Sequence, residues 1–541
     1  MKFIDLNDLE HSASIEVDLC VVGSGPAGAT IAKEFSTSGV QVLLIEGGGL
    51  EETPADKAIY DVENVGAIRT TPQDLVRNRV IGGSSHSWSG RCASFDDIDF
   101  ESRAWVPHSG WPICKADIDP FLDRSRRHLG LGPNIYDDRL WDALGISPPS
   151  PTFDPAFLKS QFWQYSRDTR KSGEPTRFSR VLAELGAPNV KLLVHANVTH
   201  INTNESGTRI KSLEVSTLSG KRTEVKTNVV VLACGALENA RLLLASKGFN
   251  PNGIGNSNDL VGRFLTDHPG CTLGWFTPQQ SAAIQNRLGS YLLEHKDGRH
   301  PYAFGLMLSP EIQRKEKLLN CAVFLNQIPN IDKPWGALKR LISPNGTRQR
   351  ISKVRDASLV IRNLPSLLSD ASQRIAMRQR QIPKIDKTPL YCLVEQTPDP
   401  LSRVTLAQQT DALGVPLLRV DWRIGELERR SVIRLNELIE TELCRVGLPG
   451  YRCNDRLLRD LDWRSQFIDR AHPSGTTRMS DSPKQGVVDR NCRAHEVAGL
   501  YIAGSSIFPT AGHANPTLMI VALAIRLADW LKSKEFAAKH A

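Results

Sequence analysis

Residues 18–30 of the chain read DLCVVGSGPAGAT, and this stretch decides how the N-terminal part folds. The apolar run Leu19–Val22 is typical of a buried strand in a parallel sheet. It leads into the glycines of a GxGxxG motif, Gly23, Gly25 and Gly28. Gly23 permits a tight turn, Gly25 lets the backbone approach a pyrophosphate, and Gly28 allows a helix to pack closely on the strand. The stretch therefore predicts a strand, a glycine turn and a helix in direct succession.

A second strand and an acidic residue complete this unit. Residues 40–45 read VQVLLI, and Glu46 follows them directly. An acid at this position accepts hydrogen bonds from an adenosine ribose, while the N–H groups and the dipole at the helix N-terminus hold the phosphates. The order of these parts predicts a dinucleotide-binding α/β domain. It does not distinguish NAD from FAD, although a glycine motif at the extreme N-terminus of a chain of this length is typical of FAD enzymes.

The composition excludes several other classes of protein. Of the 541 residues, 40% are hydrophobic and 23% are charged, which excludes wholesale disorder. No apolar run approaches the ~20 residues of a membrane-spanning helix. The ten cysteines form no CxxC pair, and no Cys/His cluster has zinc spacing, so we expect free thiols and no metal site. With no secretory signal at the N-terminus, we expect a cytoplasmic protein, and export with a partner subunit stays open.

One segment makes the chain basic. The net charge is +8, and residues 333–387 hold 13 Lys and Arg against 3 Asp. Such a segment can bind nucleic acid, an acidic membrane surface or an acidic protein, and it can also be a solvated helical surface or a lid. Trp335 is its one aromatic residue, so it lacks the stacking platforms of single-strand binders and we expect no nucleic-acid partner.

Further along the chain, glycine-rich loops alternate with strand-like runs. Residues 79–91 read RVIGGSSHSWSGR, and Gly82 and Gly83 permit a loop that lies flat against a ring system. Residues 132–175 are rich in Pro, Asp and Ser and suggest a long excursion or lid. Strand-like runs at 189–193, 198–201, 210–215 and 222–226 suggest a small antiparallel sheet.

The C-terminal part contains two kinds of sequence pattern. Residues 270–460 carry strand-like runs that predict a mixed sheet with helices, interrupted by the basic segment. Residues 499–510 then return to a short strand followed by small residues. A helix is expected from Pro516 to Ser533, with Asn515 as its N-terminal cap.

These motifs together resemble the glucose–methanol–choline (GMC) family of FAD-dependent alcohol oxidoreductases. The resemblance covers nearly the whole chain and is carried by IGGSS at 81–85, AHPSGTTRM at 471–479 and SIFPTAGHANPT at 506–517. Within the family, EQTPDPLSRVTL at 395–406 points to bacterial sugar and glycoside oxidoreductases related to pyranose oxidases.

The resemblance implies a catalytic pair and a set of cofactor contacts. The family's base falls on His472 and its partner on Asn515, while His513 aligns with a variable position and is expected to be structural. Arg478, Asp267 and His268 recur in similar contexts and are also expected to be structural. The implied contacts with FAD are Gly23, Gly25, Gly28, Glu46, Gly82, Gly83, Ser84, Ser87, Val198, Gly504, Ser505, Asn515, Pro516 and Thr517.

The chemistry needs these residue types. Alcohol oxidation removes the hydroxyl proton and transfers a hydride to flavin N5, and a neutral imidazole is a suitable base near pH 7. Some relatives attach FAD through a His in the loop after the double glycine. Here Ser87 stands at that position and His86 lies one residue earlier, so noncovalent FAD is expected.

The resulting hypothesis is an FAD-dependent oxidoreductase that acts on an alcohol group, expected to belong to a sugar or glycoside, and passes electrons to oxygen, a quinone or a soluble carrier. The alternatives are a flavin-dependent monooxygenase, which would need a second nucleotide motif that is not found, and a non-catalytic electron-transfer flavoprotein. The expected domains are an FAD-binding domain (1–130, 190–268 and 462–541), a lid or excursion (131–189) and a substrate-binding domain (269–461) with a basic insertion at 333–387. An acidic partner at that insertion is a further expectation.

Overall fold

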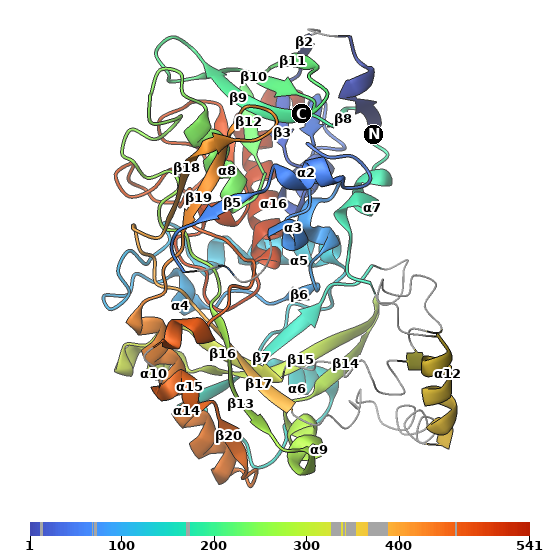
Figure 1. The fold of residues 1–541 in the computed structure, drawn as a ribbon, viewed down its shortest axis with the longest axis vertical. Coiled ribbons are helices and arrows are strands. Elements are labelled where there is room, and N and C mark those ends of the chain that lie inside the picture. Colours follow the sequence, from blue (N-terminus) through green and yellow to red (C-terminus); the bar gives the residue numbers. More distant parts are fainter. Residues whose placement is uncertain are drawn as a thin grey trace.

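The computed structural model describes residues 1–10, 14–67, 69, 73–168, 174–325, 337–338, 341, 353–365, 388–459 and 462–540. Most of the predicted basic insertion at 333–387 lies outside the described residues. Within it the structure places helix α12 (Lys353–Arg362), which stands beside the lower half of the molecule in Figure 1. The expectation of an acidic partner for this segment stays a prediction.

A six-stranded parallel sheet forms the core of the upper half (Figure 1). Its order is β1 (Lys2–Asp5), β8 (Val190–Val194), β4 (Val42–Ile45), β3 (Leu19–Val22), β12 (Val229–Leu232) and β21 (Leu500–Ile502). Every residue of β3, β4, β12 and β21 is buried, as expected for strands covered on both faces. The predicted Rossmann-like α/β class is confirmed.

Apolar helices cover this sheet. The glycine turn leads into α1 (Pro26–Glu34), which packs on α16 (Thr517–Lys534), and α16 in turn packs on α5 (Asp119–Leu129). Helix α8 (Ala236–Ala245) follows β12 and contacts β9 (Asn197–Thr203). Nearly every residue of α8 and ten of the eighteen in α16 are buried. The ends of the chain are therefore held together, because α1 and α16 belong to one layer.

A four-stranded sheet lies next to the parallel sheet, in the order β2 (Ser14–Glu16), β11 (Arg222–Lys226), β10 (Ile210–Ser216) and β9. The predicted antiparallel group is corrected in one respect, because residues 190–194 form β8 of the parallel sheet instead. β8 reads VKLLV, and its buried apolar residues suit a sheet covered on both faces.

An eight-stranded sheet dominates the lower half of Figure 1. Seven strands run in the order β20 (Tyr451–Cys453), β13 (Gly270–Phe276), β17 (Thr388–Val394), β16 (Cys321–Leu325), β15 (Gly298–Leu308), β7 (Leu158–Tyr165) and β6 (Arg91–Cys92), and β14 (Ser290–His295) pairs with β15. All of these pairs are antiparallel. The associated helices are α6 (Arg139–Leu144), α9 (Pro278–Arg287), α10 (Pro310–Glu316), α14 (Glu426–Arg445) and α15 (Asp455–Arg459).

The expected lid at 131–189 is corrected by this sheet. Strand β7 pairs with β15 over seven residues, from Tyr302 opposite Gln164 to Leu308 opposite Leu158. Phe162 and Trp163 are fully buried on its two faces. The surrounding Pro, Asp and Ser residues indicated a loop, but a strand covered on both faces has no alternating pattern to reveal it.

A small three-stranded sheet, β18 (Arg403–Thr410), β19 (Pro416–Asp421) and β5 (Val62–Asn64), packs on α8. The remaining described α-helices are short: α2 (Pro54–Ala58), α3 (Gln73–Val76), α4 (Asp97–Phe100), α7 (Phe178–Ala183) and α17 (Ala537–His540). Five 3-10 helices complete the described elements: η1 (Leu6–Asp8), η2 (Gly83–His86), η3 (Lys115–Asp117), η4 (Trp463–Gln466) and η5 (Ser505–Ile507).

Candidate active site

One cavity of about 620 Å³ runs along the carboxyl ends of β4, β3, β12 and β21. This is the edge where parallel α/β sheets bind their ligands. The predicted residues in its wall are Gly23, Gly25, Glu46, Gly83, Ser84, Ser87, Val198, His472, Gly504, Ser505, Asn515, Pro516 and Thr517. Two predicted contacts, Gly28 and Gly82, lie outside the wall.

The glycine turn has the shape that a dinucleotide needs. A Cβ atom on Gly25 would meet no heavy atom within 4 Å, so the backbone faces open space where a pyrophosphate would lie. A Cβ on Gly23, which has φ +101°, would lie 2.6 Å from the Ala233 carbonyl oxygen. A Cβ on Gly28 would lie 1.9 Å from the Gly23 carbonyl oxygen. Gly28 therefore allows helix α1 to sit beneath the turn and does not face the cavity.

Glu46 directly follows strand β4 and is hydrogen-bonded to Ser24 of the glycine turn. Its Oε2 accepts hydrogen bonds from the Ser24 hydroxyl at 2.6 Å and the Ser24 N–H at 3.2 Å, and its Oε1 accepts from the Gly48 N–H at 3.0 Å. Burial raises the pKa of Glu46, and the bonds from Ser24 and Gly48 oppose that rise. The carboxyl group is thus oriented before any ligand binds.

The double-glycine loop lies against the glycine turn. Gly82 has φ +89°, and a Cβ there would lie 2.4 Å from the Ser179 nitrogen, so Gly82 shapes the loop. Ser87 is in the cavity wall. His86 is exposed, is absent from the wall, and its Nε2 lies 2.9 Å from the Ile81 carbonyl oxygen. The structure thus places Ser87, not His86, beside the cavity.

Asn515 stands where the C-terminal loop meets α16, and its predicted capping role is wrong. The cap residue of α16 is Pro516, and no side chain caps the helix. The Asn515 Nδ2 instead lies 3.4 Å from His472 Nε2, and its Oδ1 has no hydrogen-bond partner. The amide is therefore directed into the cavity next to the imidazole.

His472 contacts a second histidine that the sequence did not mark as functional. His472 Nδ1 lies 3.0 Å from His268 Nδ1, and His268 Nε2 lies 3.2 Å from the Ala511 carbonyl oxygen. A carbonyl oxygen only accepts, so His268 Nε2 carries a hydrogen, and in a neutral ring its Nδ1 is then an acceptor. His472 must therefore donate from Nδ1. This leaves the lone pair of His472 on Nε2, the nitrogen that faces Asn515.

The surroundings keep His472 neutral. Burial lowers its pKa well below the ordinary value of 6.5, and the positive charges of Arg470 and Arg69 lower it further. Burial also lowers the pKa of His268. Both rings are thus uncharged at neutral pH, as the assignment of their hydrogens requires.

Asp267 holds the two histidine segments together. Its Oδ1 accepts the backbone N–H of His268 at 2.7 Å and that of His472 at 3.0 Å. Its Oδ2 accepts from Arg69 Nη2 at 2.7 Å, and Arg69 also contacts Asp469 at 3.2 Å. The side chains of this group are at most 1% exposed. The pairing of a buried carboxylate with a buried guanidinium therefore fixes the backbone that carries both rings.

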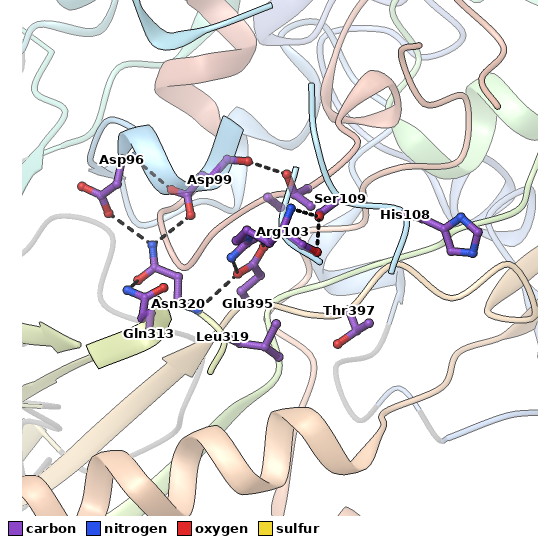
Figure 2. Close-up of polar contacts among 12 residues, drawn as sticks. Asp96, Asp99, Arg103, His108, Ser109, Gln313, Leu319, Asn320, Glu395 and Thr397 are labelled. Atoms are coloured by element: carbon purple, nitrogen blue, oxygen red, sulfur yellow. Dashed lines mark hydrogen bonds and ion pairs between the residues drawn. The ribbon is translucent and has the colours of Figure 1, made fainter. Parts of the chain in front are cut away.

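A polar network behind the site anchors the loop that carries Ala511 and Asn515 (Figure 2). The Asn320 amide donates to Asp96 at 3.2 Å and to Asp99 at 2.9 Å, and the Thr510 hydroxyl donates to the Asp99 carbonyl oxygen at 2.6 Å. Burial and the neighbouring Asp96 raise the pKa of Asp99 well above its ordinary value, and burial raises that of Asp96 to about 6. The pair therefore retains protons at pH values where exposed carboxyls have lost theirs.

His513 is structural, as its variable alignment suggested. It is fully buried, its two ring nitrogens have no hydrogen-bond partner, and it lies edge-on to Trp163 with ring centroids 6.0 Å apart. Burial lowers its pKa to about 3. His513 is absent from the cavity wall, whereas His472 lies in it.

Sequence reasoning missed several charged residues of the cavity wall. They are Arg77, Arg79, Arg91 and Arg470. The Arg79 guanidinium lies 5.4 Å from the Tyr60 ring centroid and donates to the Asn197 side chain. The signal was available, because Arg79 and Arg91 bound the double-glycine stretch and Arg470 precedes the AHP motif. These cations suit a ligand that carries phosphates.

The open space at Gly25, the N-terminus of α1 and the oriented Glu46 together fit FAD. The turn would hold the pyrophosphate, and the part of the cavity wall that includes His472 would lie beside the ring system.

Among the residues that the structure describes, no helix is both long and apolar enough to cross a bilayer.

Curated relatives resemble this chain over nearly its full length. A 2-methyl-1,2-propanediol dehydrogenase from Mycolicibacterium austroafricanum is 23% identical and covers 96% of each chain. The paromamine 6'-oxidase of Streptomyces fradiae is 24% identical over 94% of this chain and 90% of its own. The crystal structure of formate oxidase superposes with a TM-score of 0.57 at 17% identity, over 97% of this chain and 99% of the other, which shows the fold.

Two family models match the chain in order. Residues 161–270 match the N-terminal model and residues 398–524 the C-terminal model, both described as GMC oxidoreductase. The two matches contain β8, β12, His268, His472 and Asn515. The chain therefore carries matches to the N- and C-terminal models of the GMC oxidoreductases and is an FAD-binding enzyme of this type.

Proposed function

We propose that the protein oxidises an alcohol to a carbonyl compound, with His472 as the general base and Asn515 as the residue that orients the hydroxyl group. The observation that carries this proposal is the lone pair on His472 Nε2, which lies at the cavity wall with the Asn515 Nδ2 donor 3.4 Å away. When bound, FAD supplies the acceptor for the hydride that leaves the carbon atom. The hydroxyl proton goes to His472 Nε2, so the alcohol loses one hydride and one proton.

The chain prepares His472 for this step in three ways. The contact with His268 leaves the lone pair on Nε2, the buried environment keeps the ring uncharged, and Asp267 fixes the backbone on which the ring stands. A base that must accept a proton near neutral pH needs all of these properties. His472 becomes positively charged as it accepts the proton, and this charge stabilises negative charge that develops on the substrate oxygen.

Asn515 supports the same geometry. Its Nδ2 is a donor for the substrate oxygen, and its Oδ1 has no partner in the protein. An amide does not titrate, so it orients the hydroxyl without competing for the proton. Neither the monooxygenase nor the electron-transfer alternative requires such a base and donor pair.

We propose a sugar, glycoside or other polyol as the substrate. One relative is named for a propanediol and another for paromamine, and both names denote hydroxylated molecules. Part of the cavity wall comes from the eight-stranded sheet and includes Phe324 and Leu393. These two residues are apolar, whereas the part formed by the parallel sheet is rich in glycine. We therefore propose that this sheet carries the substrate-binding domain.

We further propose that FAD is bound noncovalently. Ser87, which stands at the family's attachment position, is in the wall, while His86 is directed to the Ile81 carbonyl. Acid or heat should release the flavin into the supernatant. Flavin that stays with the precipitated protein would exclude noncovalent binding.

The test of the activity is anaerobic reduction of the bound flavin, followed by its absorbance, across a panel of sugars, glycosides and simple alcohols. Bleaching by at least one alcohol is expected. Bleaching by NAD(P)H alone would favour the monooxygenase, and inertness to both would favour the electron-transfer protein. For the acceptor we propose a quinone or soluble carrier with weak use of oxygen, and rapid stoichiometric peroxide formation in air would contradict this.

A further inference from the structure

A hairpin far from the cavity places two histidines on one face. Strands β14 and β15 pair with Leu293 opposite His300 and His295 opposite Gly298. Side chains two residues apart on a strand share a face, so His295 lies on the same face as Leu293 and as its cross-strand partner His300. Asp297, in the turn between the strands, lies next to both rings.

The three side chains converge on one oxygen atom. His295 Nδ1 contacts Asp297 Oδ1, and His300 Nε2 lies 3.6 Å from the same oxygen. The ligand atoms of all three residues lie within 4.8 Å of one another. Ligand atoms around a tetrahedral Zn²⁺ ion are bound at about 2.0–2.2 Å each, so small rotations of these side chains bring the three atoms to such an ion.

His300 supplies the strongest sign of a missing ligand. It is 7% exposed, and its Nε2 is buried with no hydrogen-bond partner. The ring lies over Gly132, where a Cβ would come within 2.6 Å of His300 Cγ, so its position is restricted. An unsatisfied buried nitrogen costs free energy that a bound metal would recover.

Arg126 contacts the other oxygen of Asp297, Oδ2, and leaves Oδ1 to the two histidines. Arg126 on α5 donates to Asp297 Oδ2 at 2.9 Å, and its own Nε pairs with Asp123 at 2.6 Å. Arg126 therefore occupies the oxygen that faces away from the histidines. A carboxylate held in this way by a second group is a common way to orient a metal ligand. The other cations close by are also engaged, because Arg299 pairs with Glu294 and Arg167 donates to the Arg299 carbonyl oxygen.

We propose that His295, Asp297 and His300 bind Zn²⁺ or a similar divalent transition metal. Two imidazoles and one carboxylate suit such ions, whereas Ca²⁺ and Mg²⁺ prefer sets of oxygen atoms. Three protein ligands leave one position for water. The ion joins the hairpin to α5 through Asp297 and Arg126. The expectation of no metal site rested on the spacing of Cys and His residues, and a carboxylate between two histidines falls outside that pattern.

The test uses the tag-free, FAD-loaded protein after treatment with EDTA and removal of the chelator. Titration with ZnCl₂ in a calorimeter should show one Zn²⁺ ion per chain, and elemental analysis after dialysis should find the same ratio. His295→Gln and Asp297→Asn should each weaken Zn²⁺ binding by at least ~10-fold. Both positions are partly solvent-exposed, so these variants are expected to fold, and their flavin spectrum checks this.

His195→Gln is the matched control, because His195 Nδ1 also contacts a carboxylate, Asp5 Oδ2 at 2.8 Å, in the same kind of His–Asp pair. This variant should bind Zn²⁺ like the wild type. X-ray absorption at the zinc edge should show two imidazoles in the wild type and one in His295→Gln. A wild type that binds no Zn²⁺, or His295→Gln and Asp297→Asn variants that bind it unchanged, would overturn the proposal.

Discussion

The two ring nitrogens of His472 have different partners: Nδ1 contacts His268, and Nε2 contacts Asn515 at the cavity. Removing the His472 side chain should therefore remove the proposed proton acceptor. His472→Ala should slow flavin reduction by about 10²–10⁴-fold, because the hydroxyl proton loses its acceptor. FAD content should not change, since the cavity wall at Gly25 and Glu46 is far along the sheet edge. Stopped-flow reduction under anaerobic conditions measures the rate, and the absorbance ratio at 280 nm and in the flavin band measures FAD content.

The pH dependence of the same rate tests the protonation state of His472. Its pKa is lowered below 6.5 by burial and by neighbouring positive charge, so the ring is already a free base at neutral pH. The rate of reduction should be constant from pH 7 to 9 and should decline only as the pH falls through the lowered pKa. A rate that climbs steadily between pH 7 and 9 would mean that His472 is protonated in this range.

A substitution at Asn515 distinguishes a role in orienting the substrate from a role in stabilising helix α16. Asn515→Asp removes the Nδ2 donor and adds negative charge beside a developing alkoxide, so flavin reduction should slow by roughly 10²-fold. Because no side chain caps α16, the melting temperature should change little. Differential scanning fluorimetry beside stopped-flow kinetics gives both values. A large loss of stability with unchanged kinetics would show that Asn515 acts on the helix instead.

At the scale of elements, the glycine turn depends on the close approach of α1 to β3. Gly28→Ala would place a Cβ 1.9 Å from the Gly23 carbonyl oxygen, so the turn must move and FAD binding should be lost or reduced by at least about tenfold. Gly186→Ala is the control, because a Cβ there meets nothing within 4 Å. Flavin content after purification is the measurement, and a Gly28→Ala protein with full FAD content would contradict the packing role.

The Asp96 and Asp99 pair at α4 gives the fold its own pH dependence. Both folded carboxyls have raised pKa values, about 6 for Asp96, so the native state binds more protons than the unfolded chain. Their contribution to stability is present at acid pH and is lost as the pH rises through about 6, by roughly 1–3 kcal/mol. Asp96→Asn should therefore raise the melting temperature relative to the wild type more at pH 8 than at pH 5.

Asp61→Asn is the control for this pair, because Asp61 is exposed and is not among the groups that act on Asp96. If Asp96→Asn shows the same difference from the wild type as Asp61→Asn at both pH values, the Asp96 and Asp99 pair does not retain protons.

Elements with a strong local signal were predictable. Strand β3, the turn at Gly23 and Glu46 stand where the motif predicts them, because each is fixed by neighbours within a few residues of the chain. Strand β7 was not predictable, since its place in the sheet depends on pairing with β6 and β15, two strands that are distant from it in the sequence. It is also covered on both faces, so its sequence does not alternate. Asn515 was misread as a cap, because Asn before Pro at a helix start is a common capping pattern.

At the scale of the molecule, buried ion pairs join segments that are distant in sequence. Arg103, after α4, forms two hydrogen bonds to Glu395, which follows β17, and both side chains are at most 1% exposed (Figure 2). Glu395→Gln leaves the Arg103 charge buried without its partner and should cost about 3–5 kcal/mol of unfolding free energy. Denaturant unfolding measures this loss, and Glu101→Gln, next to the same segment but more exposed, should change stability little.

The parts of the site that were not predicted are those formed by contacts between segments distant in the sequence. His268 and Arg69 acquire their roles through contacts with residues about two hundred or four hundred positions away. The motif around His268 gave no sign that its ring would meet His472, because sequence proximity does not report contacts between separate segments. The proposed catalytic pair, His472 and Asn515, was accessible only through the family resemblance, and the contact with His268 that places the hydrogen on His472 Nδ1 was not accessible.

The chain of contacts from His472 to His268 ends at the Ala511 carbonyl oxygen, which cannot accept a proton and pass it on. No proton wire to bulk water therefore leads out through the back of the site by way of His268. In the proposed reaction, a proton that His472 accepts would therefore leave from Nε2, the nitrogen on the cavity side, and not through His268. The carbonyl product and the proton would then leave from the same side of His472, and the next substrate molecule could bind productively only after both had left.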